Sequence, residues 1–167
     1  MPIAGAIAWS VVGIGGMLLP PWRECLLLFV ATGSIVYLGM FVSRFTGEHF
    51  LDRTRPRNAF DSLFMHTVAM SLLVYAIAIP FFLRDYTSLP LTVGILSGLM
   101  WLPLSWLIQH WIGIAHAIVR TTLIVAAWYA FPAQRFVIIP ALIVVLYLFV
   151  IAVLEMRWRS RVASVAA

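Results

Sequence analysis

Six long apolar runs, separated by short polar breaks, constrain the fold of this chain more than any other feature. The length of each run is close to that of a helix that crosses the hydrocarbon core of a bilayer, which is roughly 17 to 25 residues. Lipid offers the backbone no hydrogen-bond partners, so such runs fold as helices. The sequence therefore predicts an all-α, polytopic transmembrane helical bundle, with spans at about 3–19, 25–42, 59–83, 89–108, 112–131 and 136–154.

The composition excludes the other broad classes. Hydrophobic residues make up 63% of the chain and charged residues only 10%, whereas a soluble domain is roughly one quarter charged. A disordered chain needs the opposite balance. No polar stretch is long enough to form a soluble domain, so we expect residues 1–167 to form a single transmembrane domain. The N-terminus lacks the basic region of a secretory signal, so we expect the first apolar run to remain in the mature protein.

The arginines indicate the orientation. All eleven cationic residues are arginine. With six spans, one side of the membrane collects eight of them: Arg44, Arg53, Arg55, Arg57, Arg120, Arg157, Arg159 and Arg161. The other side collects Arg23, Arg84 and Arg135. By the positive-inside rule, both termini and the arginine-rich loop 43–58 are then cytoplasmic. In a five-span alternative, 89–108 and 112–131 form one bent helix. The C-terminal arginines would then lie on the opposite side of the membrane, and the bias would be lost.

Several residues indicate what the chain contacts. The basic segments are short and flank apolar runs, which favours the lipid bilayer over nucleic acid as a partner. We expect anionic lipids to contact Arg53, Arg55, Arg57, Arg157, Arg159 and Arg161. Gly94 and Gly98 form a GxxxG motif, and Gly113 and Ala117 form a second pair of small residues. These pairs leave open whether helices join within one chain or in a homo-oligomer. Cys25 is the only cysteine, so no intrachain disulfide can form.

Ionisable residues inside a span are the candidate functional residues, because a central arginine costs about 2.5 to 3.5 kcal/mol on insertion scales. His66 and Arg120 lie at a similar depth in two spans that enter from the same side. Gln109, His116 and Arg120 form one helical stripe if their helix begins early enough. This combination favours an anionic or carbonyl-bearing ligand held by Arg120. The predicted ligand-binding residues are Arg120, His116, His66, Gln109 and Asp61.

Structural roles for the same residues stay open. Arg120 is long enough to reach cytoplasmic headgroups, or to pair with Asp61 or Glu155. Asp61 follows Asn58 at the spacing of a helix N-terminal cap. The four histidines are scattered, which predicts no metal site.

The sequence leaves three hypotheses on function, each from a different class of protein. No nucleophile elbow, phosphate loop or dinucleotide fingerprint is present, so we expect no cofactor and no enzyme activity. The leading hypothesis is a membrane protein that binds or transports a small anionic or polar solute. The alternative is a non-catalytic scaffold that binds anionic lipid or protein through its arginines. A lipid-modifying enzyme with His66 or His116 as its base is a third hypothesis.

One stretch resembles a known type of protein. Residues 103–106 (Pro-Leu-Ser-Trp), 109–113 (Gln-His-Trp-Ile-Gly) and 116–120 (His to Arg) carry the resemblance. This part of the chain is similar to an uncharacterised family of small bacterial multispan membrane proteins, a domain of unknown function. Gln109 stands where the resemblance leads us to expect a basic residue. The resemblance implies an all-helical membrane protein and no particular activity.

Overall fold

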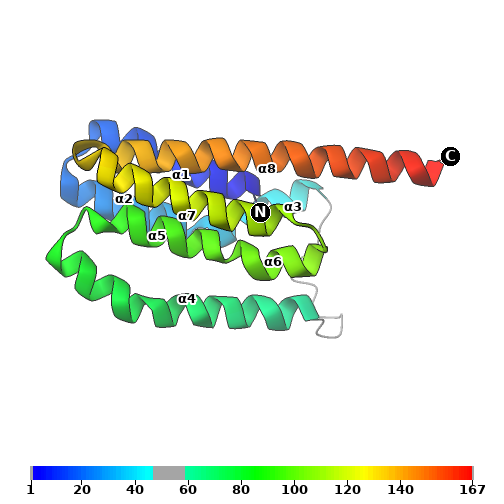
Figure 1. The fold of residues 1–167 in the computed structure, drawn as a ribbon, viewed down its shortest axis with the longest axis horizontal. Helices are drawn as coiled ribbons and strands as arrows, with labels where there is room; N and C mark the ends of the chain where they lie inside the picture. Colours follow the sequence, from blue (N-terminus) through cyan, green and yellow to red (C-terminus); the bar gives the residue numbers. More distant parts are fainter. Residues whose placement is uncertain (1, 47–58, 167) are drawn as a thin grey trace.

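The computed structural model describes residues 2–46 and 59–166, and these residues are almost entirely α-helical. Figure 1 shows the order of the helices along the chain. They are α1 (Pro2–Leu18), α2 (Pro21–Gly33), α3 (Ile35–Thr46), α4 (Ala59–Arg84), α5 (Ser88–Leu99), α6 (Trp101–Ile108), α7 (Ile112–Ala130), the 3-10 turn η1 (Pro132–Gln134) and α8 (Arg135–Ala166). The predicted all-α class is confirmed, and α8 continues twelve residues beyond the predicted end of its segment at residue 154.

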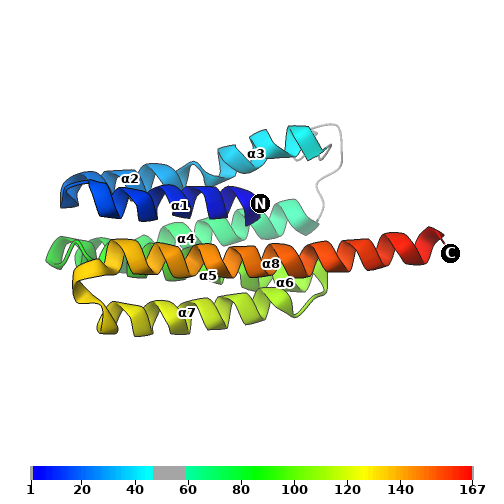
Figure 2. The ribbon, with the colours of Figure 1, turned by 90° about the horizontal axis from the view of Figure 1, so that it is seen from above.

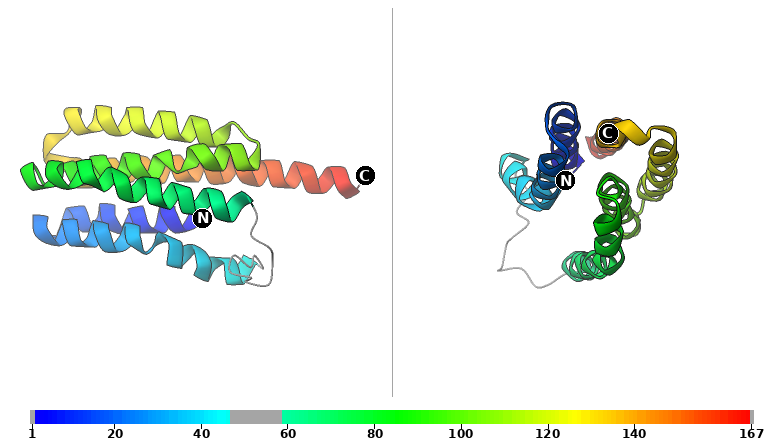
Figure 3. Two further views of the ribbon diagram at one scale, coloured as in Figure 1. Left: turned by 90° about the horizontal axis from the view of Figure 1, so that it is seen from below. Right: turned by 90° about the vertical axis from the view of Figure 1, so that its left-hand side faces the viewer.

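The helices run up and down a common axis (Figures 1 and 2). The turns α1–α2, α4–α5 and α7–α8 lie at one end, whereas the α6–α7 turn lies at the other, from which α8 projects well beyond its neighbours. Helix α1 packs chiefly on α8 and α2, and α7 packs on α5, α6 and α8. Figure 3 shows α1–α3 together on one side of the bundle, and α4 at its edge beside α5.

Helix length and hydropathy support a membrane location. Within the described residues, three helical segments are long and apolar enough to cross a membrane: Ser88–Ile108, Ile112–Ala130 and Pro132–Ser160. Pro2–Leu18 and Leu72–Arg84 are shorter apolar helices. Helix α6 ends at Ile108 and α7 begins at Ile112, so the fourth and fifth predicted segments are separate helices rather than one bent helix.

Two of the predicted segments are broken helices. The first break, at Ser34, separates α2 from α3, and the second, at Met100, separates α5 from α6. Pro103 explains the second break, because it lacks the N–H that would bond the Leu99 carbonyl. Pro80 and Pro140 lie inside α4 and α8, which continue through them. This second break divides the segment 88–108 and lies between its two ends.

The α6–α7 turn is very tight. Gln109 adopts a left-handed conformation with φ of 50° and ends α6. The Ser105 hydroxyl donates to the His110 carbonyl, and the His110 amide donates to the Ser105 carbonyl at 3.2 Å. A Cβ atom added at Gly113 would lie only 2.6 Å from the Trp101 carbonyl oxygen. Only glycine lets the start of α7 approach α6 this closely.

At the opposite end, Arg135 joins two turns. Its guanidinium lies 3.6 Å from the Asp85 carboxylate and 3.9 Å from the centre of the Trp128 ring. It also donates to the Thr87 hydroxyl and to the Trp128 carbonyl. The Thr87 hydroxyl in turn holds the pKa of the Asp85 carboxyl below its usual range. These contacts tie the α4–α5 turn to the α7–α8 turn.

The two glycines of the GxxxG motif allow helices of the same chain to pack closely together. A Cβ added at Gly94 would lie 2.9 Å from Ile124, and one added at Gly98 would lie 2.9 Å from the Arg120 side chain. Both glycines therefore bring α5 close to α7.

The predicted lipid contacts Arg53, Arg55 and Arg57 lie outside the described residues.

We expect Gly113→Ala to destabilise the protein, because the added methyl group meets the α6 backbone and overpacking costs about 1 to 3 kcal/mol. Gly33→Ala is the matched control, since a Cβ added there meets nothing within 4 Å. Thermal unfolding in detergent should show a lower midpoint for Gly113→Ala and an unchanged or higher midpoint for Gly33→Ala. Equal midpoints for the two variants would contradict the tight α6–α7 turn.

Candidate functional site

A fully buried arginine lies at the centre of the bundle. Arg120 is the ninth residue of α7, about 12 Å along the helix from its start. Its side chain is 0% exposed. One terminal nitrogen, Nη2, donates to the Ser97 hydroxyl of α5 at 2.6 Å. Ser97 directs its own hydroxyl hydrogen to the Val93 carbonyl, so its oxygen is free to accept. Gly98, one residue further on, leaves the space that the arginine stem occupies.

Aromatic rings form the walls around the guanidinium. The Cζ atom of Arg120 lies 5.5 Å from the centre of the Trp9 ring and 5.3 Å from that of Tyr147. Trp9 comes from α1 and Tyr147 from α8, and both are almost completely buried. A cation over an aromatic face is attracted to the negative face of the ring, by about 2 kcal/mol or more when water is excluded. The rings therefore stabilise the charge without neutralising it.

His116 completes the cluster one helical turn before Arg120. Its Nε2 atom lies 3.5 Å from Nη1 of Arg120. Its ring packs against Trp101, with 4.7 Å between the ring centres, and against Tyr147, with 5.3 Å. His116 is 3% exposed. An imidazolium here would place two positive charges side by side in a dry environment, which is unfavourable. His116 therefore adds a polar, uncharged side chain to the cluster.

No carboxylate among the described side chains balances the charge of Arg120. Asp85 pairs with Arg135, and Glu155 pairs with Arg159 on the exposed surface of α8. Three buried polar atoms of the cluster also lack a hydrogen-bond partner: Nε of Arg120, Nε1 of Trp9 and Nδ1 of His116. Buried donors are rarely left unpaired, and each costs about 1 to 3 kcal/mol. The cluster thus combines a net positive charge with unused donors.

The broken fourth segment supplies one wall of this cluster. Ser97 and Gly98 stand just before the break at Met100, and Trp101 stands just after it. Helix breaks at membrane depth are tolerated where they face protein or a polar site, and in transporters they are characteristic of binding sites. The break lets one segment bring a hydroxyl to Arg120 and an indole to His116.

Comparison with known proteins gives a family. Residues 1–157 match the family of unknown function DUF7010. The chain belongs to this family. No curated protein and no solved structure is detectably similar to it. Membership of DUF7010 confirms the resemblance found in the sequence and assigns no activity.

The structure brings together only part of the ligand site predicted for this DUF7010 protein. Arg120 and His116 are in contact, as the spacing on α7 suggested. Gln109 was expected to share their stripe only if the helix began early enough, and α7 begins at Ile112, so this condition is not met. Gln109 is exposed in the α6–α7 turn, where its amide donates to the Trp106 carbonyl.

The remaining predicted ligands lie elsewhere. His66 is exposed on α4, and none of the described contacts of Arg120 and His116 comes from this helix. Equal depth in the membrane does not make two helices neighbours, and α4 packs chiefly against α5. The side chain of Asp61 lies outside what the structure describes.

The C-terminal arginines are separate from this cluster. Arg157 donates to the Ile108 carbonyl at 3.0 Å and so caps the end of α6. Arg159 is exposed and pairs with Glu155 at 2.9 Å. The side chain of Arg161 lies outside the described part of the structure. Arg157 therefore contributes to the position of the α6–α7 turn.

Sequence reasoning missed the residues that surround Arg120 and His116 from other helices: Trp9, Ser97, Trp101 and Tyr147. A signal for three of them was present. Tryptophan and tyrosine concentrate at membrane interfaces, yet Trp9, Trp101 and Tyr147 fall in the middle of apolar runs. Their depth predicts a polar neighbour inside the bundle.

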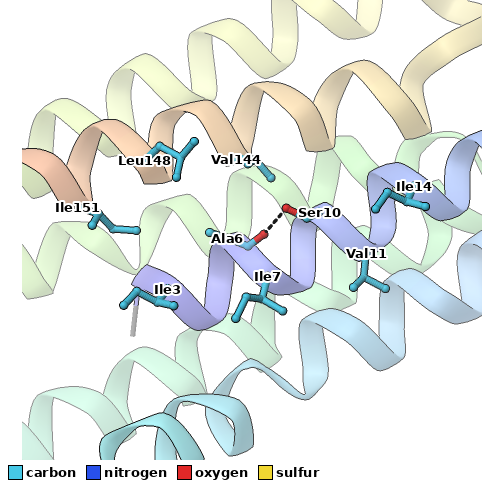
Figure 4. A pocket seen from close by; sticks show the side chains of 9 residues that line it. All are labelled: Ile3, Ala6, Ile7, Ser10, Val11, Ile14, Val144, Leu148 and Ile151. Atoms are coloured by element: carbon cyan, nitrogen blue, oxygen red, sulfur yellow. Dashed lines mark hydrogen bonds between the residues drawn. The ribbon is translucent and has the colours of Figure 1, made fainter. Parts of the chain in front are cut away.

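An apolar groove on the outer face of the bundle offers different chemistry. It encloses about 620 Å³ between α1 and α8. Figure 4 shows Ser10 as its hydroxyl-bearing residue among aliphatic ones, and that hydroxyl donates to the Ala6 carbonyl at 2.8 Å. A groove of this kind suits hydrocarbon.

Among the described residues, no group of three or more histidine, cysteine or acidic side chains is placed to hold a metal ion.

Proposed function

We propose that the protein crosses the cytoplasmic membrane of a bacterium six times, with both termini in the cytoplasm. In this topology α1, α4, α7 and α8 are single passes, and α2–α3 and α5–α6 are broken passes. The antiparallel arrangement in Figure 2 supports it, because the α4–α5 and α7–α8 turns share one end of the bundle. The positive-inside bias places this end outside the cytoplasm.

Cysteine labelling in intact cells tests this topology. In a Cys25→Ala background, Tyr86→Cys lies in the α4–α5 turn and Ser160→Cys lies on the exposed end of α8. A membrane-impermeant maleimide should label Tyr86→Cys in intact cells and Ser160→Cys only after lysis. Labelling of both positions in intact cells would contradict the proposed topology.

We propose that the function of the protein is to bind a small anion inside the membrane, with Arg120 as the principal ligand. The observation that carries this proposal is a fully buried guanidinium with no carboxylate partner among the described side chains. A buried charge is normally paired, because its transfer from water costs several kcal/mol or more. An anion in contact with Arg120 supplies the missing negative charge.

The neighbours of Arg120 suit binding rather than catalysis. Ser97 fixes one edge of the guanidinium, and the faces of Trp9 and Tyr147 hold its plane. The Nε–H edge is left to face a ligand. No nucleophile adjacent to a free base accompanies them in the described cluster, so we propose no covalent chemistry.

Stabilisation by added anions tests the binding function. Thermal unfolding of the purified protein is measured in sodium salts of chloride, formate, acetate and phosphate, against gluconate as a bulky reference, at constant ionic strength. A ligand at 100 times its Kd adds about 2.7 kcal/mol to stability, so a bound anion should raise the melting temperature by several degrees. Arg120→Gln should abolish this difference between anions.

Arg159→Gln is the matched control, because Arg159 is exposed on α8. It should retain the full effect of the stabilising anion. The proposal is wrong if all anions give the same melting temperature in the wild type, or if Arg120→Gln responds to them as the wild type does.

A further inference from the structure

We infer that the anion held at Arg120 is a halide-sized monovalent ion, bound between the Nε–H group of Arg120 and the indole N–H group of Trp9. This inference rests on the proposed anion-binding function and specifies its ligand. It assigns Trp9 a binding role in addition to its contact with the charge.

The first argument is the pair of unused donors. Nε of Arg120 and Nε1 of Trp9 are both fully buried, and neither has a hydrogen-bond acceptor among the described residues. The two side chains are in contact, with 5.5 Å between Cζ of Arg120 and the centre of the Trp9 ring. Two side chains in contact, each with one unused N–H donor, can share a small acceptor placed between them.

The second argument is charge. Arg120 brings one positive charge, and no second cation lies within its described contacts. His116, 3.5 Å from the guanidinium, cannot add another without strong repulsion. A monovalent anion neutralises the site, whereas a divalent one would leave a negative charge buried and unpaired.

The third argument is size and surroundings. Trp9, Tyr147 and Trp101 close tightly around Arg120 and His116, and all five side chains are at least nine-tenths buried. A compact, easily dehydrated ion fits among closely packed side chains more readily than an anion with a carbon skeleton does.

Trp9→Phe is the variant that separates this inference from a packing role. Phenylalanine keeps an aromatic face for Arg120 and removes the N–H donor. Trp106→Phe is the matched control, because the Trp106 side chain is 64% exposed on α6. Each variant is titrated with sodium chloride and sodium bromide, against gluconate at constant ionic strength, with the melting temperature as the readout.

The wild type and Trp106→Phe should be stabilised by chloride and bromide at millimolar concentrations. The half-saturating concentration should rise at least tenfold in Trp9→Phe, which corresponds to the loss of one hydrogen bond to a charged group. Equal half-saturation in Trp9→Phe and Trp106→Phe would overturn the role of Trp9.

The choice of ligand has its own decisive outcome, which does not depend on how the variant folds. Stabilisation by formate, acetate or phosphate but not by halides, lost in Arg120→Gln, would overturn this inference and leave the anion-binding function standing. If no anion stabilises the wild type, both the inference and the proposed function are wrong. Stabilisation by halides that persists in Arg120→Gln would place the ion elsewhere and also overturn the inference.

Discussion

The burial of one positive charge without a carboxylate partner is the constraint on which the centre of this structure depends. Arg120 lies in the middle of α7, in a segment about as long as the bilayer core is thick. A charge at this depth is costly, so its neighbours must lower that cost. Ser97 accepts one hydrogen bond, and two aromatic faces attract the cation. Four helices, α1, α5, α7 and α8, therefore converge on a single side chain.

The breaks and close approaches in the chain serve this convergence. The break at Met100 lets α5 present Ser97 and Gly98 to Arg120 while α6 places Trp101 against His116. Gly113 and the left-handed Gln109 let α7 turn back tightly on α6. Arg135 and Arg157 fix the two ends, one by joining turns and the other by capping α6. Arg135 and Arg157 thus act at the ends of helices, whereas Arg120 and His116 act in the interior of the bundle.

The sequence predicts the helices far better than it predicts their neighbours. Run lengths and polar breaks indicated the helical segments, because these features depend on local backbone chemistry. Depth along a helix was also readable, which identified Arg120 and His116. The sequence did not show which helices pack side by side. His66 matches Arg120 in depth but lies on α4, outside the cluster. Trp9 and Tyr147, separated by most of the chain, meet only because α1 packs on α8.

The side-chain Nε–H signal of Arg120 in ¹⁵N–¹H NMR spectra tests the central claim most directly. The labelled protein is placed in lipid nanodiscs, the signal is assigned by its loss in Arg120→Lys, and hydrogen–deuterium exchange is followed. Arg159, exposed on α8, is the internal reference. A buried guanidinium predicts exchange at least a hundredfold slower than that of Arg159. Equal exchange rates would show that Arg120 reaches water, and would contradict the burial of this charge inside the bundle.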